Sequence, residues 1–352
     1  MPEAPAPWRF AAILRPASGR PRLNRTAIQV WLTSLLLVFV ATSAARAEDL
    51  PSWNDGPARD AIQKFVAEVT TEGSPDFVPV PERIAVFDND GTLWAEQPMY
   101  FQFLFVVDRI RAMAKDHPEW RGKQPYDAVI RGDMKALAAS GQKGVAELMA
   151  VTHAGMNTDG FAAIVADWFA TARHPKTKQP YTAMVYQPML ELLDYLRARG
   201  FKTFIVSGGG VEFMRVFAEK TYGIPPEQVI GSTGGLKWNV RDGVPELIKL
   251  PKIDAIDDRA GKPVGIQRFI GRRPIFAFGN SDGDKEMLEW TAAGKGARFM
   301  GLVHHTDATR EWAYDRASKI GTLDKALDEA VARHWTVVDM KQDWKRVFAF
   351  EP

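Results

Sequence analysis

The sequence predicts an α/β fold in which a parallel sheet is interrupted by a mainly helical insertion. Three short apolar segments each end in polar or acidic side chains, at residues 84–88, 201–207 and 275–280. Short apolar runs with β-branched residues are typical of strands buried on both faces of a parallel sheet. A helical pattern over residues 211–220 follows the second strand, whereas residues 95–186 separate the first two strands and are mainly helical in pattern.

Residues 1–47 have the pattern of a secretory signal peptide. Three arginines between residues 20 and 25 precede an apolar stretch over residues 27–41, and Ala45-Arg46-Ala47 has the small-x-small form of a signal-peptidase site. We therefore expect cleavage after Ala47 and a periplasmic or secreted protein. An uncleaved membrane anchor is the alternative, because the apolar stretch is near the lower length limit for spanning a bilayer.

The composition of the chain argues against nucleic-acid partners and against sites built from cysteine. The leader holds six Arg and one Glu, so its removal changes the formal net charge from +2 to −3, and no basic footprint for nucleic acid remains. We also expect no stable membrane association after cleavage. The chain has no cysteine, which excludes disulfides and thiolate metal sites and makes an oxidising compartment tolerable.

Elements outside the motifs are expected to serve packing. Residues 57–71 predict an amphipathic helix with Ile62, Phe65, Val66 and Val69 on one face. Residues 297–303 predict a further strand. No metal-ligand spacing relates His153, His174, His304 and His305, so we expect these histidines to lie at the surface or to bond locally.

The first strand, residues 84–87, ends in two carboxylates, Asp88 and Asp90, followed by a Gly-Thr turn. Open α/β sheets place their ligands at the carboxyl ends of the strands, and residues i and i+2 share a face. Asp88 and Asp90 are therefore expected to share one Mg²⁺ or one reacting group. A plain polar turn is the simpler alternative. An EF-hand loop is excluded, because Gly91 falls at the fourth position from Asp88 and not at the sixth.

The second strand ends in Ser207 and three glycines before the predicted helix. Glycines let backbone amides approach an anion closely, and a helix N-terminus favours negative charge. Ser207, Gly208 and Gly209 are thus candidates for binding a phosphate, although the glycines alone would also be explained by a tight turn.

Lys262 lies just before Pro263, which is well placed as the first residue of a helix to about residue 270. This position aims Lys262 at an anion in the cleft. Lys249 and Lys252 lie nearby as rivals, and most lysines are only solvated surface charges.

The third strand breaks into a run of oxygen ligands over residues 279–284, which contains Asn280, Asp282 and Asp284. Hard cations such as Mg²⁺ take oxygen ligands and keep several waters. A polar turn is the alternative here, but acidic turns follow two strands of the same chain.

The four motifs, in this order, resemble those of the haloacid dehalogenase-like hydrolase superfamily. The resemblance implies that Asp88 is the nucleophile and Asp90 the general acid/base, with Ser207, Lys262 and the amides of Gly208 and Gly209 on the phosphate. It also implies a Mg²⁺ ion held by Asp88, Asp90, Asn280 and Asp284. The family usually has an acid where this chain has Asn280, and Asp282 is extra, so which of these last residues contacts the metal stays open.

The same resemblance implies a Rossmann-like doubly wound parallel sheet with an inserted α-helical cap, as in the phosphoserine phosphatase-like branch. The core would comprise residues 48–94 and 187–352, and the cap residues 95–186. Trp94 and Tyr100, near the start of the insertion, would offer π faces to an organic cation if the substrate were an amine phosphate.

The function implied is a Mg²⁺-dependent phosphomonoester hydrolase that acts on a small organic phosphate through an aspartyl-phosphate. An acid at position 90 favours phosphate esters, because family members that cleave carbon-halogen or phosphorus-carbon bonds lack it. The alternative is a periplasmic binding protein of the same fold that has lost most turnover through Asn280.

Overall fold

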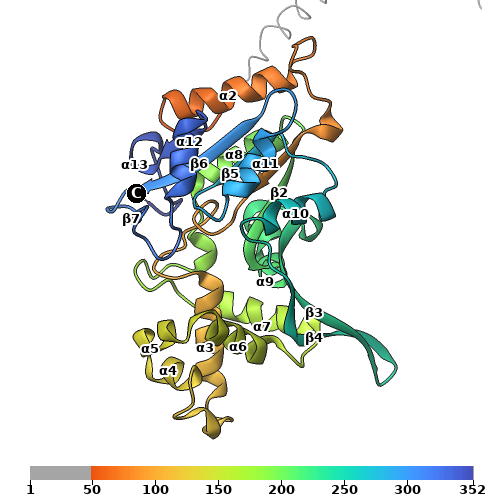
Figure 1. Cartoon of the computed structure of the whole chain (residues 1–352), viewed down its shortest axis with the longest axis vertical. Helices are drawn as coiled ribbons and strands as arrows, with labels where there is room; N and C mark the ends of the chain where they lie inside the picture. The colour runs from red at the N-terminus through yellow and green to blue at the C-terminus, as the bar shows by residue number, and fades with distance from the viewer. Residues whose placement is uncertain (1–48, 352) are drawn as a thin grey trace, which may run out of the picture. The chain divides into compact units, whose positions relative to one another are not determined.

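The computed structural model describes residues 49–351, so the predicted signal peptide lies outside the described residues. Its sheet has eight strands in the order β4-β3-β2-β1-β5-β6-β7, with β8 paired to β6 (Figure 1). The strands are β1 (Ile84–Phe87), β2 (Lys202–Gly210), β3 (Val229–Arg241), β4 (Val244–Ala255), β5 (Phe276–Gly279), β6 (Phe299–Thr306), β7 (Ala313–Tyr314) and β8 (Thr336–Asp339).

Helices flank this sheet and fill the insertion between β1 and β2. They are α2 (Pro57–Thr70), α3 (Phe101–Met113), α4 (Tyr126–Arg131), α5 (Met134–Ala139), α6 (Gly141–His153), α7 (Thr158–Thr171), α8 (Gln187–Arg197), α9 (Val211–Tyr222), α10 (Gly261–Phe269), α11 (Lys285–Ala292), α12 (Lys325–Ala332) and α13 (Met340–Asp343). Within residues 49–351, no helix has the length and apolar character needed to cross a membrane.

The central strands are parallel and buried on both faces. Strand β1 pairs in parallel with β2 on one side and with β5 on the other. Side chains alternate along a strand, so Ala85 and Phe87 belong to one apolar cluster, whereas Ile84 and Val86 belong to a second one. This two-sided burial explains why the strand sequence is apolar throughout, and the predicted α/β fold with a parallel sheet is confirmed.

Residues 95–186 are mainly helical, as expected, and contain α3 to α7. Their assignment as a separate cap domain, with the core boundaries given above, stays a prediction.

Strands β3 and β4 form a long antiparallel hairpin that the sequence reasoning did not predict. Its turn, Asp242-Gly243, has φ values of 51° and 78°, and positive φ at both positions is the geometry that favours Asp-Gly in two-residue hairpin turns. The hairpin runs from the sheet to α6 and α7 (Figure 1). There Gly155 N donates to Lys249 O at 2.9 Å, and Lys249 N donates to Met156 O at 2.9 Å.

Two predicted boundaries differ from the structure. Helix α10 begins at Gly261, two residues before Pro263, so Lys262 lies inside the first turn of the helix rather than ahead of it. Strand β6 continues to Thr306 and therefore includes His304 and His305.

Candidate active site

The turn after β1 positions both catalytic candidates. The Asp88 amide donates to the carbonyl of Phe278 in β5 at 3.0 Å, which fixes the end of the strand. Gly91 has φ of 79°, and a Cβ at this position would lie 2.1 Å from Nδ2 of Asn280. Because only glycine fits this conformation and this close approach, the turn after Asp90 packs directly against Asn280 of the third motif.

Lys262 joins the first motif to the third. Its Nζ donates to Oδ1 of Asp88 at 2.6 Å and to Oδ1 of Asp284 at 2.5 Å, and its side chain is only 2% exposed. Oδ2 of Asp284 accepts the backbone amides of Asn280 at 2.9 Å and Ser281 at 3.0 Å. The structure therefore brings Asp88, Lys262 and Asp284 together, and both carboxylate oxygens of Asp284 already have partners.

The rival lysines, Lys249 and Lys252, line the same cavity but are paired with other acids. Lys249 is buried and pairs with Glu212 at the start of α9. Lys252 is more than half exposed and pairs with Asp254 at 2.9 Å. Neither forms a bond to Asp88, so Lys262 is the lysine of the site.

Asp90 points to the side chain of Trp94, whose Nε1 donates to Oδ1 of Asp90 at 2.9 Å. Trp94 is 1% exposed and stacks on Phe217 with ring centroids 4.4 Å apart. The expectation that Trp94 offers a π face to a ligand is therefore wrong, because both its ring and its N–H are used inside the protein.

Burial controls the protonation of both acids. Burial and the nearby Asp284 raise the pKa of Asp88, while Lys262 opposes this rise. Burial also raises the pKa of Asp90, against the lowering effect of the hydrogen bond from Trp94. A carboxylic acid that keeps its proton more readily is suited to protonate a leaving group.

The glycine-rich segment lies beside these groups. Ser207, Gly208 and Gly209 line the same cavity as Asp88, Asp90 and Lys262. The Gly209 amide donates to Oγ of Ser207 at 3.1 Å. The Gly210 amide donates to Oε1 of Gln102 in α3 at 2.7 Å. The second motif thus shares the cavity with the first motif and is bonded to the helical insertion through Gln102.

The side chain of Asn280 has its partners in the first motif and just after it. Its Oδ1 accepts the hydroxyl of Thr92 at 3.1 Å, and its Nδ2 donates to Oε1 of Glu96 at 2.8 Å. The extra acid, Asp282, is separate from this site. Its Oδ1 accepts the amides of Asp324 and Ala326, each at 2.9 Å, at the start of α12.

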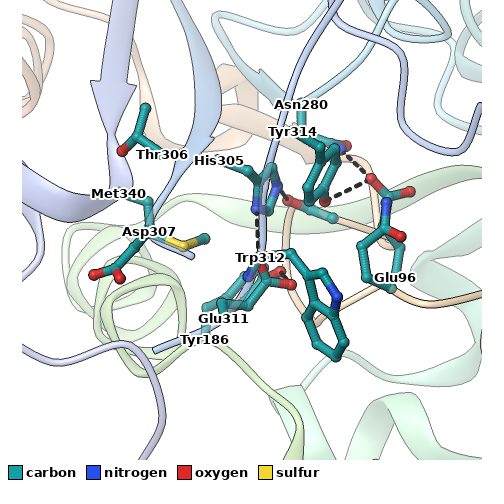
Figure 2. A network of polar contacts seen from close by, with 12 residues as sticks. Glu96, Tyr186, Asn280, His305, Thr306, Asp307, Glu311, Trp312, Tyr314 and Met340 are labelled. Carbon is teal, nitrogen blue, oxygen red and sulfur yellow. Dashed lines mark hydrogen bonds and ion pairs between the residues drawn. The ribbon is translucent and has the colours of Figure 1, made fainter. Parts of the chain in front are cut away.

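A network of buried polar side chains, which includes Glu96, His305 and Glu311, lies next to the turn that follows β1 (Figure 2). Tyr314 donates to Oε1 of Glu96 at 2.8 Å. Nε2 of His305 lies 2.8 Å from the carbonyl of Gly91 and Nδ1 lies 3.2 Å from Oε2 of Glu311. A carbonyl oxygen only accepts hydrogen bonds, so Nε2 of His305 carries a hydrogen. A hydrogen bond between Nδ1 of His305 and Oε2 of Glu311 then needs a second proton, which lies between these two atoms.

These network residues were missed by the sequence reasoning. His305 is 2% exposed and His174 is fully buried, and each bonds a distant carbonyl, so the expectation of a surface or locally bonded side chain is wrong for both. Glu96 is 1% exposed. Glu96 lies shortly after the first motif, which is a weak indication in the sequence that it belongs to the site. The sequence around Tyr314 and Glu311 gives no such indication.

The charge and donor types at this site fit a Mg²⁺ ion. Asp88 and Asp284 both contact the buried cation Lys262, and Asp90 and Glu96 add two more acidic groups close to Asp88. Among residues 49–351, no three acidic or histidine side chains are grouped as a complete metal cage. Mg²⁺ is commonly held by one or two carboxylates together with waters and substrate phosphate, so Asp88 and Asp90 would suffice as carboxylate ligands for such an ion.

Comparisons with known proteins give the same fold. A family model described as haloacid dehalogenase-like hydrolase matches residues 85–289, more than half of the chain. No curated protein sequence matches the chain. A functionally unknown protein from Anaerococcus prevotii is 17% identical, with 79% of this chain and 90% of that chain covered and a TM-score of 0.50.

Two further solved structures are more distant in shape. A protein of unknown function from Bordetella pertussis is 17% identical, covers 74% of this chain and 99% of its own, and has a TM-score of 0.47. A probable phosphoserine phosphatase from Vibrio cholerae is 14% identical, covers 77% of this chain and 70% of its own, and has a TM-score of 0.35. At these identities the similarity concerns the fold alone.

Proposed function

Because the chain belongs to the haloacid dehalogenase-like hydrolase family, we propose that it is a Mg²⁺-dependent phosphomonoester hydrolase acting on a small phosphate ester. The observation that carries this proposal is the bridge from Lys262 to Asp88 and Asp284, next to a second acid, Asp90. A buried ammonium group beside a carboxylate suits a dianionic phosphate that must approach a negatively charged nucleophile.

In the first step, a carboxylate oxygen of Asp88 attacks phosphorus, and the bond between phosphorus and the ester oxygen breaks. The electron pair leaves with the ester oxygen, which takes the proton of Asp90 and departs as the alcohol. Lys262 and the hydroxyl of Ser207 stabilise negative charge on the phosphoryl oxygens. When bound, Mg²⁺ supplies additional positive charge at the phosphoryl group.

In the second step, water attacks the phosphorus of the aspartyl-phosphate on Asp88. The ionised Asp90 takes a proton from this water, and the bond between phosphorus and Asp88 breaks. Inorganic phosphate leaves, Asp88 is again a carboxylate and Asp90 is again protonated.

The test measures phosphate release from para-nitrophenyl phosphate by the purified protein, with and without Mg²⁺. Asp88→Asn should abolish turnover without lowering the melting temperature, because the amide has nearly the same shape but is a poor nucleophile. Asp90→Asn should slow turnover by about 10²- to 10⁴-fold. Normal turnover in Asp88→Asn would remove Asp88 from the mechanism.

A wild-type protein that binds phosphate but releases none from any ester would instead support the alternative, a binding protein that retains the fold.

For location, we propose a periplasmic or secreted protein, on the basis of the leader pattern in residues 1–47. In a Gram-negative-type host, the mature chain should begin at Glu48 and be released by osmotic shock. N-terminal sequencing that finds Met1 on a membrane-bound protein would contradict this proposal.

A further inference from the structure

The catalytic residues lie at one end of a cavity of about 930 Å³. Asp88, Asp90, Ser207 and Lys262 belong to its lining, and the remaining wall comes largely from α3, α5, α6 and β4. Cavities of this size hold a drug-sized ligand. The volume is far larger than a phosphate group needs, so most of it is available to the alcohol part of an ester.

Away from the catalytic end, the wall is mainly apolar. It includes Phe103, Leu137, Val145, Met149, Phe161 and Ile253. These side chains come from α3, α5, α6, α7 and β4. An apolar wall of this kind stabilises a ligand roughly in proportion to the apolar area that the ligand removes from water.

The two lysines of this wall are already paired within the protein. Lys249 pairs with Glu212 and lies 4.5 Å from the centroid of the Phe161 ring. Lys252 pairs with Asp254. A carboxylate on the leaving group would have to compete with Glu212 for the buried Lys249, whereas an apolar group would disturb no ion pair.

We propose that the substrate is a phosphate monoester of a bulky apolar alcohol, with its phosphate at Asp88 and its apolar part along α5, α6 and β4. This inference rests on the proposed phosphatase function and specifies its substrate class. It differs from an amine phosphate such as phosphocholine and from a phosphorylated amino acid such as phosphoserine, which are too small and too polar to cover the apolar wall.

The first experiment compares kcat/KM for ethyl, butyl, hexyl and octyl phosphate, O-phosphoserine and phosphocholine, all below their micelle-forming concentrations. Each buried CH₂ group should raise kcat/KM about fourfold, so hexyl phosphate should exceed ethyl phosphate on the order of 100-fold. Equal values across the alkyl series, or a preference for phosphoserine or phosphocholine over hexyl phosphate, would overturn the proposal.

The second experiment changes the wall. Met149→Gln should reduce the advantage of octyl over ethyl phosphate about tenfold, because one polar amide removes favourable apolar contact. Met113→Gln is the matched control, since Met113 has similar partial burial in the same insertion but does not line the cavity. Ile253→Gln repeats the test where folding is not at risk, because Ile253 is 54% exposed.

Unchanged chain-length preference in both Met149→Gln and Ile253→Gln would overturn the proposed position of the apolar part.

Failure of the function and failure of the inference give different results. If no ester is hydrolysed, including para-nitrophenyl phosphate, the phosphatase function fails. Calorimetric binding of the alkyl phosphates to Asp88→Asn then tests the cavity by itself. Affinity that grows with chain length, with a negative heat-capacity change, supports the apolar site. Affinity independent of chain length overturns it.

Discussion

Asn280 and Glu96 together place one carboxyl group beside the catalytic turn. Both side chains are 1% exposed, and Nδ2 of Asn280 donates to Oε1 of Glu96 at 2.8 Å. Burial raises the pKa of Glu96, and the nearby Asp90 and Asp88 raise it further, against the hydrogen bond from Tyr314. The carboxylate expected at position 280 is thus absent, but a carboxylate lies directly next to it.

This arrangement predicts the outcome of a charge exchange. Asn280→Asp should place two acids at hydrogen-bond distance and destabilise the protein by about 1–3 kcal/mol, because Glu96 loses one of its two donors. Asn280→Asp combined with Glu96→Gln should restore most of this stability, since one acid and one amide again face each other. Urea unfolding measures the stabilities, and Mg²⁺ titration of activity shows whether the exchange alters metal binding. A double variant no more stable than Asn280→Asp would contradict the pairing.

At the residue scale, the sequence was informative where chemistry follows a strand directly. Asp88, Asp90, Lys262 and Asp284 were identified from short local motifs, and the structure places Asp88, Lys262 and Asp284 in mutual contact. Glu96 was not identified as a site residue, because its partners Asn280 and Tyr314 lie 184 and 218 positions away in the chain. Such contacts depend on the completed fold and leave no local pattern.

At the scale of the elements, the first backbone amides of α12 donate to a side chain of the third motif. Asp282 accepts the amides of Asp324 and Ala326, where the helix has no side-chain cap of its own. Asp282→Ala should therefore lower the stability by about 1 kcal/mol, typical of a lost cap, with kcat nearly unchanged. Asp282→Asn keeps the accepting oxygen and is the control. A large loss of Mg²⁺-dependent activity in Asp282→Ala would instead make Asp282 a metal ligand.

The segment between β4 and α10 carries a buried acid, Asp257, whose Oδ2 has no hydrogen-bond partner. Burial raises the pKa of Asp257 from 3.8 to about 7. Between these values the folded state keeps a proton that the unfolded state has lost, so stability should fall as the pH rises from about 4 to about 7. The slope contributed by one such group is at most about 1.4 kcal/mol per pH unit.

The measurement for Asp257 is urea unfolding between pH 4 and pH 8. Asp257→Asn should flatten the decline relative to the parent protein. Asp254→Asn, an exposed neighbour, should leave the decline as it was. Parallel curves for the parent and Asp257→Asn would mean that Asp257 ionises normally.

Elements with a strong local pattern were predicted well. The amphipathic helix expected over residues 57–71 is α2, and the first strand has the bounds expected from its apolar run. The hairpin of β3 and β4 was missed, although Asp242-Gly243 is a recognisable turn. Much of its outer part is exposed, with Trp238 at 64% and Val244 at 65%. It therefore lacks the continuous apolar run by which the buried strands were recognised.

For residues 49–351 as a whole, β4 bonds to the helical insertion, and β3 pairs with the central strand β2. The sheet and the insertion are thus joined by backbone hydrogen bonds as well as by packing. We expect one cooperative thermal transition, with the same midpoint by circular dichroism and by tryptophan fluorescence. An insertion that melts at a clearly lower temperature than the sheet would contradict this prediction.

The bonds between β4 and the insertion also bear on solubility. Strand β4 is the last strand on its side of the sheet, and an uncovered edge strand offers unpaired backbone groups to another chain. Gly155 and Met156 occupy such groups on Lys249, and Asn157 forms a bridge with Ile248. Residues 95–186 therefore shield a sheet edge as well as the cavity, and a protein shortened by this segment would be prone to aggregate through β4 even if its sheet still formed.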